Sequence, residues 1–146
     1  VKADRMDLLA KAVEFIQEQG LPAGIGGHKL DVPMAVETAK IPVDYHVKTI
    51  HPHSYWSARP DGPQHDNTWC EQPGETIKYM AKIEKPWIAF KVMAAGAIHP
   101  KKAFRYAFEA GADFLMAGMF DFQIPEDAKL ARQAIEGLTR QRPWRA

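Results

Sequence analysis

The fold is decided by residues 86–120, which read PWIAFKVMAAGAIHPKKAFRYAFEAGADFLMAGMF. The apolar residues at 86–95 predict a strand, and the turn around Gly96 follows it. Pro100 begins a predicted helix that runs to residue 110, where Gly111 ends it. A second apolar run at 114–119 predicts the next strand. A strand, a helix and another strand joined by short turns form the unit of a parallel sheet.

The same alternation extends over the whole chain. The predicted strands are 21–27, 43–50, 86–95 and 114–119, and the predicted helices are 7–19, 31–40, 73–82, 100–110 and 125–138. We therefore predict one α/β domain over residues 1–146. Residues 51–73 lack periodicity, and a loop of this length predicts a lid or rim of an active site. Residues 140–146 are predicted to form a flexible tail.

Composition argues against several classes of partner. The 146 residues include 19 Lys and Arg against 18 Asp and Glu, so the formal net charge is +1. This balance supplies neither a basic face for nucleic acid nor a polybasic patch for a membrane. No apolar run approaches the roughly 18 residues of a membrane span. The single cysteine, Cys70, excludes an internal disulfide and a multi-cysteine zinc site. We expect a cytoplasmic protein that binds neither nucleic acid nor membranes.

The predicted strand 43–50 favours a barrel because its two faces differ. One face carries Val43, Tyr45, Val47 and Thr49, and the other carries Asp44, His46, Lys48 and Ile50. A doubly wound sheet has helices on both sides, so both of its faces are apolar. In a barrel the apolar face meets the helices, and the polar face points into an interior whose upper layer opens onto the active site. A four-stranded open sheet is the alternative.

Residues 91–120 resemble the seventh and eighth units of phosphate-binding (β/α)8 barrels. The shared features are the small-Gly-small turn at 95–97, the helix end Gly-Ala-Asp at 111–113 and the small-Gly pair at 117–118. The resemblance implies that backbone N–H groups of Gly96, Ala97 and Gly118 hold the phosphate of a small substrate, because glycine leaves the backbone open to the oxygens. Residues 26–28, 47–49 and 86–91 are also similar to uncharacterised bacterial barrel proteins, which imply no activity.

By this resemblance the chain supplies strands five to eight of a TIM barrel. Such a half-barrel leaves its first and last strands unpaired and its interior facing water. We therefore expect either self-association or an N-terminal half-barrel from a longer protein.

Two lysines predict a reaction. Lys48 and Lys91 are each the sixth residue of their predicted strands, so we expect them at similar heights on adjacent strands. Both are expected to face inward. Lys91 would share its face of the strand with Trp87, Ala89 and Met93. Two poorly hydrated ammonium groups side by side lower each other's pKa, and the neutral amine is the form that attacks a carbonyl carbon. A histidine near its ordinary pKa, His28 or His51, would act as general acid or base.

The pair resembles the lysines of deoxyribose-phosphate aldolase and related class I aldolases, whose motifs are matched here by residues 47–49 and 90–96. The resemblance implies a lyase that needs no cofactor, in which Lys48 forms the Schiff base and Lys91 lowers its pKa. It also implies a small phosphorylated sugar, aldehyde or keto substrate.

A second prediction is a metal-dependent hydrolase or isomerase of the amidohydrolase type. Its divalent metal would be held by His28 and His51, after the first two strands, and by Asp121, after the fourth. A third prediction is a non-catalytic ligand-binding barrel fragment, in which each lysine pairs with an acid or reaches solvent.

Overall fold

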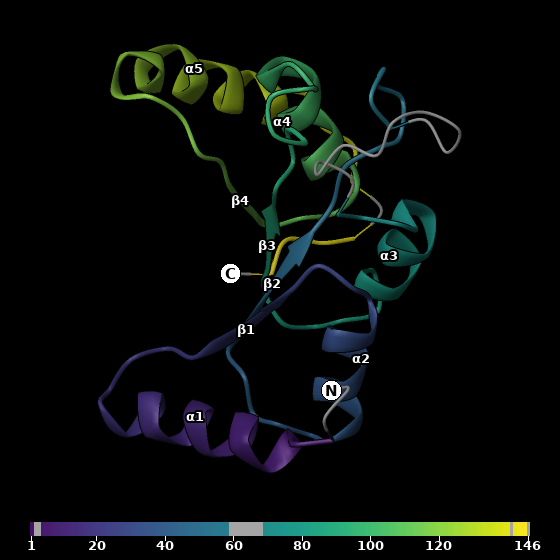
Figure 1. The fold of residues 1–146 in the computed structure, drawn as a ribbon. Coiled ribbons are helices and arrows are strands. Elements are labelled where there is room, and N and C mark those ends of the chain that lie inside the picture. Colours follow the sequence, from purple (N-terminus) through teal and green to yellow (C-terminus); the bar gives the residue numbers. More distant parts are fainter. Residues whose placement is uncertain (2–3, 59–68, 141, 146) are drawn as a thin grey trace.

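The computed structural model describes residues 1, 4–58, 69–140 and 142–145. Helices and strands alternate along this chain (Figure 1). The elements are α1 (Met6–Glu18), β1 (Gly24–Gly27), α2 (Asp31–Thr38), β2 (Tyr45–Thr49), α3 (Pro73–Met80), β3 (Trp87–Phe90), α4 (Pro100–Glu109), β4 (Phe114–Met116), the 3-10 helix η1 (Asp121–Gln123) and α5 (Ile124–Ile135). The strands pair in parallel in the order β1-β2-β3-β4, which confirms an α/β fold with a parallel sheet.

The helix starts follow local sequence signals. Pro73 and Pro100 open α3 and α4, where the missing proline N–H would have had no partner inside the helix. The His99 ring accepts a hydrogen bond from the N–H of Lys101 and so caps α4. Among the described residues, no helix combines the length and the apolar character needed to span a membrane.

The strands are shorter than the sequence predicts. The predicted strand 86–95 ends at Phe90, because Lys91 turns to a φ of 54° and the chain leaves the extended conformation. A run of apolar residues favours a strand equally at 86–90 and at 92–95, so the pattern could not place this end.

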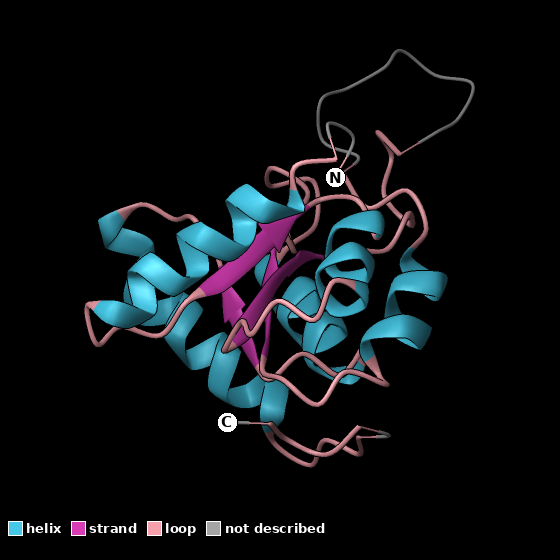
Figure 2. Ribbon diagram, turned by 90° about the horizontal axis from the view of Figure 1, so that it is seen from below, coloured by secondary structure: helices cyan, strands magenta, loops and turns pink. Residues whose placement is uncertain are grey.

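The main core lies between the sheet and the helices that surround it (Figure 2). Trp87 and Ala89 of β3 pack there with Met80 of α3 and with Phe104 and Ala107 of α4. The sequence predicted that Trp87 and Ala89 would face a barrel interior, and this prediction is wrong. A smaller core, formed by Val13, Ala23, Val36, Ile41 and Val43, ties α1 and α2 to the β1 end of the sheet.

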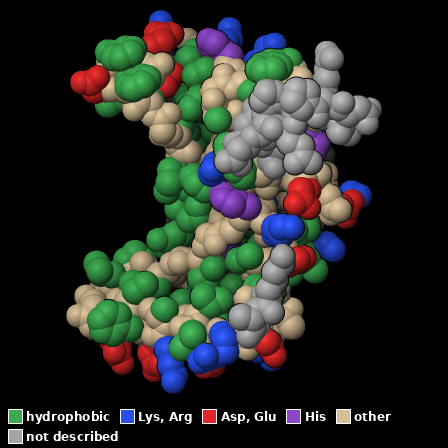
Figure 3. Space-filling view, in the orientation of Figure 1, with side chains coloured by type: hydrophobic (Ala, Val, Ile, Leu, Met, Phe, Trp, Pro, Cys, Tyr) green, Lys and Arg blue, Asp and Glu red, His purple; other side chains and the backbone are tan. Residues whose placement is uncertain are grey.

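The opposite face of the sheet is open. Phe114 and Met116 of β4 are 47% and 49% exposed, and Ile88 and Phe90 of β3 are half-buried. Figure 3 shows a hollow lined by apolar side chains on this side, between the part of the molecule that holds α1 and the part that holds α5. The open face is therefore concave and apolar.

The expected orientation of β2 is also wrong. His46 and Lys48 are each 1% exposed on the side that the helices cover, whereas Tyr45 and Val47 are half-buried on the open face. The buried side accepts His46 because its Nε2 lies 2.7 Å from Oε1 of Glu37 in α2. Buried polar groups are tolerated when they find hydrogen-bond partners, so the alternation of polar and apolar residues did not reveal which face the helices cover.

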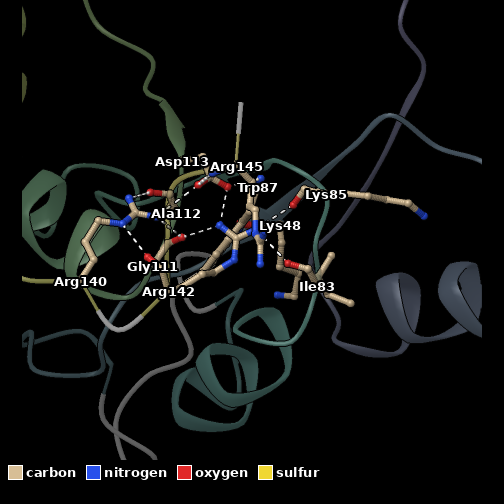
Figure 4. Close-up of polar contacts among 10 residues, drawn as sticks. All are labelled: Lys48, Ile83, Lys85, Trp87, Gly111, Ala112, Asp113, Arg140, Arg142 and Arg145. Carbon is tan, nitrogen blue, oxygen red and sulfur yellow. Dashed lines mark hydrogen bonds and ion pairs between the residues drawn. The ribbon is translucent and has the colours of Figure 1, made fainter.

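Within the predicted flexible tail, the described residues 140, 142 and 145 make polar contacts with the body of the protein. Asp113, which precedes β4, forms ion pairs with Arg142 and Arg140 and accepts hydrogen bonds from the backbone N–H groups of Arg145 and Trp87 (Figure 4). Arg142 is 3% exposed and also donates to the carbonyls of Gly111, Ile83 and Lys85. We call this group the Asp113 clamp. The local sequence did not reveal this anchoring, because Arg140 and Arg142 favour solvent until a buried carboxylate pairs with them.

Candidate functional site

A cavity of about 890 Å³ lies at the carboxyl ends of β3 and β4. Its walls include Trp69 and Phe90 on one side and the turn after β4 on the other, with Met116 and Gly118. Ligands of parallel β/α proteins bind at this end of the strands, because the loops that carry functional groups gather there. The cavity is therefore the leading candidate site in the described part of the chain.

The turn after β3 holds unusual backbone conformations beside this cavity. Lys91, Ala94 and Ala95 have φ values of 54°, 47° and 55°, in the left-handed region that side chains other than glycine rarely adopt. Each such residue costs about 1–3 kcal/mol and persists where the surrounding structure enforces it, often at a functional site. Gly96, with a φ of 86°, takes the same region without this cost.

The predicted phosphate ligands occupy different positions relative to the cavity. Gly96 and Gly118 line it, whereas Ala97 is not among the lining residues. The backbone N–H groups of Gly96 and Ala97 donate to Met93 and Ala94 inside the turn, at 2.9 and 3.2 Å. The N–H of Gly118, in contrast, meets no acceptor among the described residues. The turn after β4 therefore offers the N–H of Gly118, whereas Gly96 and Ala97 use their N–H groups inside the turn after β3.

Lys91 brings a cation to the cavity wall. Its Nζ lies 3.5 Å from the centroid of the Trp69 ring and 5.8 Å from that of Phe90. These distances are typical of cation–π contacts, which hold a positive charge in place without neutralising it. No carboxylate of the described residues forms an ion pair with Lys91. Its charge is available to an anionic ligand.

Lys48 is placed differently from Lys91. It pairs in register with Ala89, two residues before Lys91, and it is 1% exposed on the helix-covered side of the sheet. The structure therefore does not bring the two lysines into the shared inward-facing pocket that the sequence predicted. Burial, and not a neighbouring ammonium group, lowers the pKa of Lys48.

The surroundings of Lys48 suit a neutral amine. Its Nζ donates to the carbonyls of His28 and Thr49, at 2.6 and 2.8 Å, and no carboxylate of the described residues pairs with it. A neutral amine has two N–H groups, which match these two acceptors and leave its lone pair unused. A buried lysine of this kind is a candidate for reaction with a carbonyl compound.

His51 has both ring nitrogens engaged. Its Nε2 accepts from the backbone N–H groups of Trp69 and Cys70, each at 3.1 Å, and its Nδ1 donates to the carbonyl of Pro52. The ring is fully buried, and this burial lowers its pKa. His51 therefore ties the far end of the long loop to the end of β2. That bond also places Trp69 beside Lys91.

His28 lies nearer to the candidate site. Its Nδ1 is 2.7 Å from the hydroxyl of Thr49, and its ring stacks on Phe90 with the centroids 5.8 Å apart. Asp121 lies in η1, where its carboxylate accepts from the N–H of Phe122. Within the described residues, His28, His51 and Asp121 do not form a cluster that could hold a metal ion.

Sequence reasoning missed two features of this site. Asp127 of α5 lines the same cavity as Lys91 and is 6% exposed, so it adds a carboxylate to the cavity wall. The contact of Trp69 with Lys91 depends on a fold that brings together residues 22 positions apart. No local signal marks either feature.

The chain matches no protein-family model, no curated protein and no solved structure. The candidate site is therefore defined by its geometry.

Proposed function

We propose that the chain is a four-stranded half of a phosphate-binding (β/α)8 barrel and that the cavity after β3 and β4 binds the phosphate of a small phosphorylated substrate. The observation that carries this proposal is the unneutralised Lys91 ammonium on the wall of a cavity at the carboxyl ends of two adjacent parallel strands. A lyase acting on a small phosphorylated sugar, aldehyde or keto compound remains the proposed activity.

The chemistry of the walls supports a substrate with one charged end. Lys91 would pair with the phosphate, and the N–H of Gly118 would donate to one of its oxygens. Trp69, Phe90 and Met116 would pack against the remaining carbon skeleton. Asp127 would face the hydroxyl groups of such a substrate rather than its phosphate, because two negative groups in contact repel.

Replacing Lys91 by Met is expected to weaken the binding of inorganic phosphate by roughly tenfold or more, because a charge-assisted hydrogen bond is lost. The measurement is a phosphate titration followed by the backbone amide signals of Gly118 and Met119 in NMR spectra. The matched control is Lys82→Met, which changes the net charge equally at an exposed position after α3. Equal weakening by both variants, or no shift of the Gly118 signal, would contradict the proposal.

A second candidate function is Schiff-base chemistry at Lys48. The observation that favours it is the burial of this amine with two carbonyl acceptors and no carboxylate. The neutral amine would add to a carbonyl carbon, and loss of water would leave a neutral imine. A proton from a general acid would convert the imine into an iminium ion, whose positive nitrogen withdraws electrons from the adjacent carbon–carbon bond. His28, whose backbone carbonyl accepts from Lys48, and His51 are the two predicted general acids or bases. Because Lys48 and Cys70 are both 1% exposed, the residues around Cys70 would have to move before a substrate could reach the Lys48 amine.

Borohydride trapping tests this second candidate. Glyceraldehyde 3-phosphate is incubated with the protein, the imine is reduced, and peptides are identified by mass spectrometry. We expect a reduced adduct on Lys48 that is absent in Lys48→Arg and retained in Lys11→Met. An adduct on Lys91 alone, or none on Lys48 across a panel of small aldehydes, would exclude Lys48 as the nucleophile.

A further inference from the structure

Within the described part of the chain, helices cover one face of the sheet and leave the other face open. Parallel sheets are almost always packed on both faces. Here the side chains in register across the open face are apolar: Val47 lies beside Ile88, and Ile88 lies beside Phe114. Phe90 and Met116 form the next row toward the carboxyl ends. These rows make a continuous apolar surface, seen as the hollow of Figure 3.

The two edges of the sheet are also open. Within the described residues, β1 pairs only with β2, and β4 pairs only with β3. Unpaired edges present rows of N–H and C=O groups that attract another strand. Because all four strands run in parallel, an added strand that continues the sheet must run in the same direction.

The side chains on the two edge strands are complementary in size. On the open face, β4 carries the large and exposed Phe114 and Met116, whereas β1 carries Gly26, which has no side chain. A β4 strand placed beside a β1 strand would fill the space above the glycine. Large residues facing small ones are the arrangement that fills a barrel interior.

The apolar area is close to what a stable dimer needs. Six exposed residues on β4 and on the segments next to the two edges are Leu8, Phe15, Phe114, Met116, Phe120 and Phe122. If each side chain offers roughly 150–250 Å², their exposed portions amount to roughly 700 Å² per copy. A standard stable interface buries roughly 800 Å² on each partner.

We propose that the occupant of this face is a second copy of the chain. A two-fold axis along the sheet would place β4 of each copy beside β1 of the other, and both new pairs would be parallel. Together the copies would supply eight strands, the number at which a parallel β/α barrel closes around an interior filled by side chains. The net charge of +1 leaves little repulsion between the copies.

The test is the mass in solution over a concentration series, measured by light scattering and sedimentation. We expect a particle of twice the chain mass. Phe114→Lys should raise its dissociation constant by roughly a hundredfold or more, because each copy would bury an unpaired ammonium group. Met34→Lys is the matched control, since Met34 is 42% exposed on α2, away from the open face. The dissociation constant of the Met34→Lys dimer should equal that of the unsubstituted protein.

Hydrogen exchange provides a second measurement that does not depend on a variant. The amides of Gly24–Gly27 and Phe114–Met116 should become more protected as concentration rises. The proposal would be overturned if the protein is a monomer at every concentration or if the two lysine variants have equal effects. It would also be overturned if only a different β/α protein covers the open face. The phosphate titration reports on Lys91 independently, so either proposal can fail without the other.

Discussion

Asp113→Ala is expected to lower the free energy of unfolding by about 3–5 kcal/mol, the range for removing one partner of a buried ion pair. The carboxylate of Asp113 accepts from two guanidinium groups and two backbone N–H groups. Without it, the positive charge of Arg142 stays buried among carbonyl groups that cannot neutralise it. The measurement is urea unfolding followed by circular dichroism.

The control for this variant is Glu109→Ala. Glu109 also pairs with an arginine, Arg105, but both side chains are exposed, so its loss costs at most about 1 kcal/mol. If Asp113→Ala does not fold, Arg142→Met provides the measurement. That variant leaves Asp113 paired with Arg140 and should lose less stability. A loss below about 1 kcal/mol for Asp113→Ala would mean that residues 142–145 are detached in solution.

Trp87→Ala is the second large effect, with an expected loss of about 3–5 kcal/mol in the free energy of unfolding. Trp87 is fully buried in the main core, and its indole N–H donates to the carbonyl of Lys48. Removal of the ring leaves a cavity between the sheet and the helices and also leaves that carbonyl without this donor. The measurement is again urea unfolding, with the midpoint and the slope fitted separately.

Trp56→Ala is the matched control, because this tryptophan is 68% exposed in the long loop. Its effect should stay within about 0.5 kcal/mol, as for most surface substitutions. A comparable loss for both variants would show that the indole of Trp87 is not a core contact.

The fold class followed from sequence because its signals are local. Pro73 and Pro100 begin α3 and α4. Gly20 and Gly111 follow the ends of α1 and α4, with positive φ values of 73° and 101°. The faces of the strands were not predictable in the same way. His46 and Lys48 are polar, yet they are buried beneath the helices, where Glu37 pairs with Nε2 of His46 and two backbone carbonyls accept from Lys48.

The candidate site was predictable only in part. The glycine turns indicated that something binds after β3 and β4, and the cavity lies there. The left-handed φ of Lys91 was not predictable, because lysine has no preference for that region. This one dihedral directs Lys91 away from Lys48 and onto Trp69. The contribution of Asp127 depends on how α5 folds back over the turn after β4.

The Asp113 clamp also makes the two ends of the sheet different. It packs arginine side chains and backbone tightly around the amino end of β4, opposite the end where the cavity lies. Residues near Trp144 therefore lie at the end of the sheet that is away from the cavity. A fluorescent label attached there would report on the C-terminal residues and leave the candidate site unmodified.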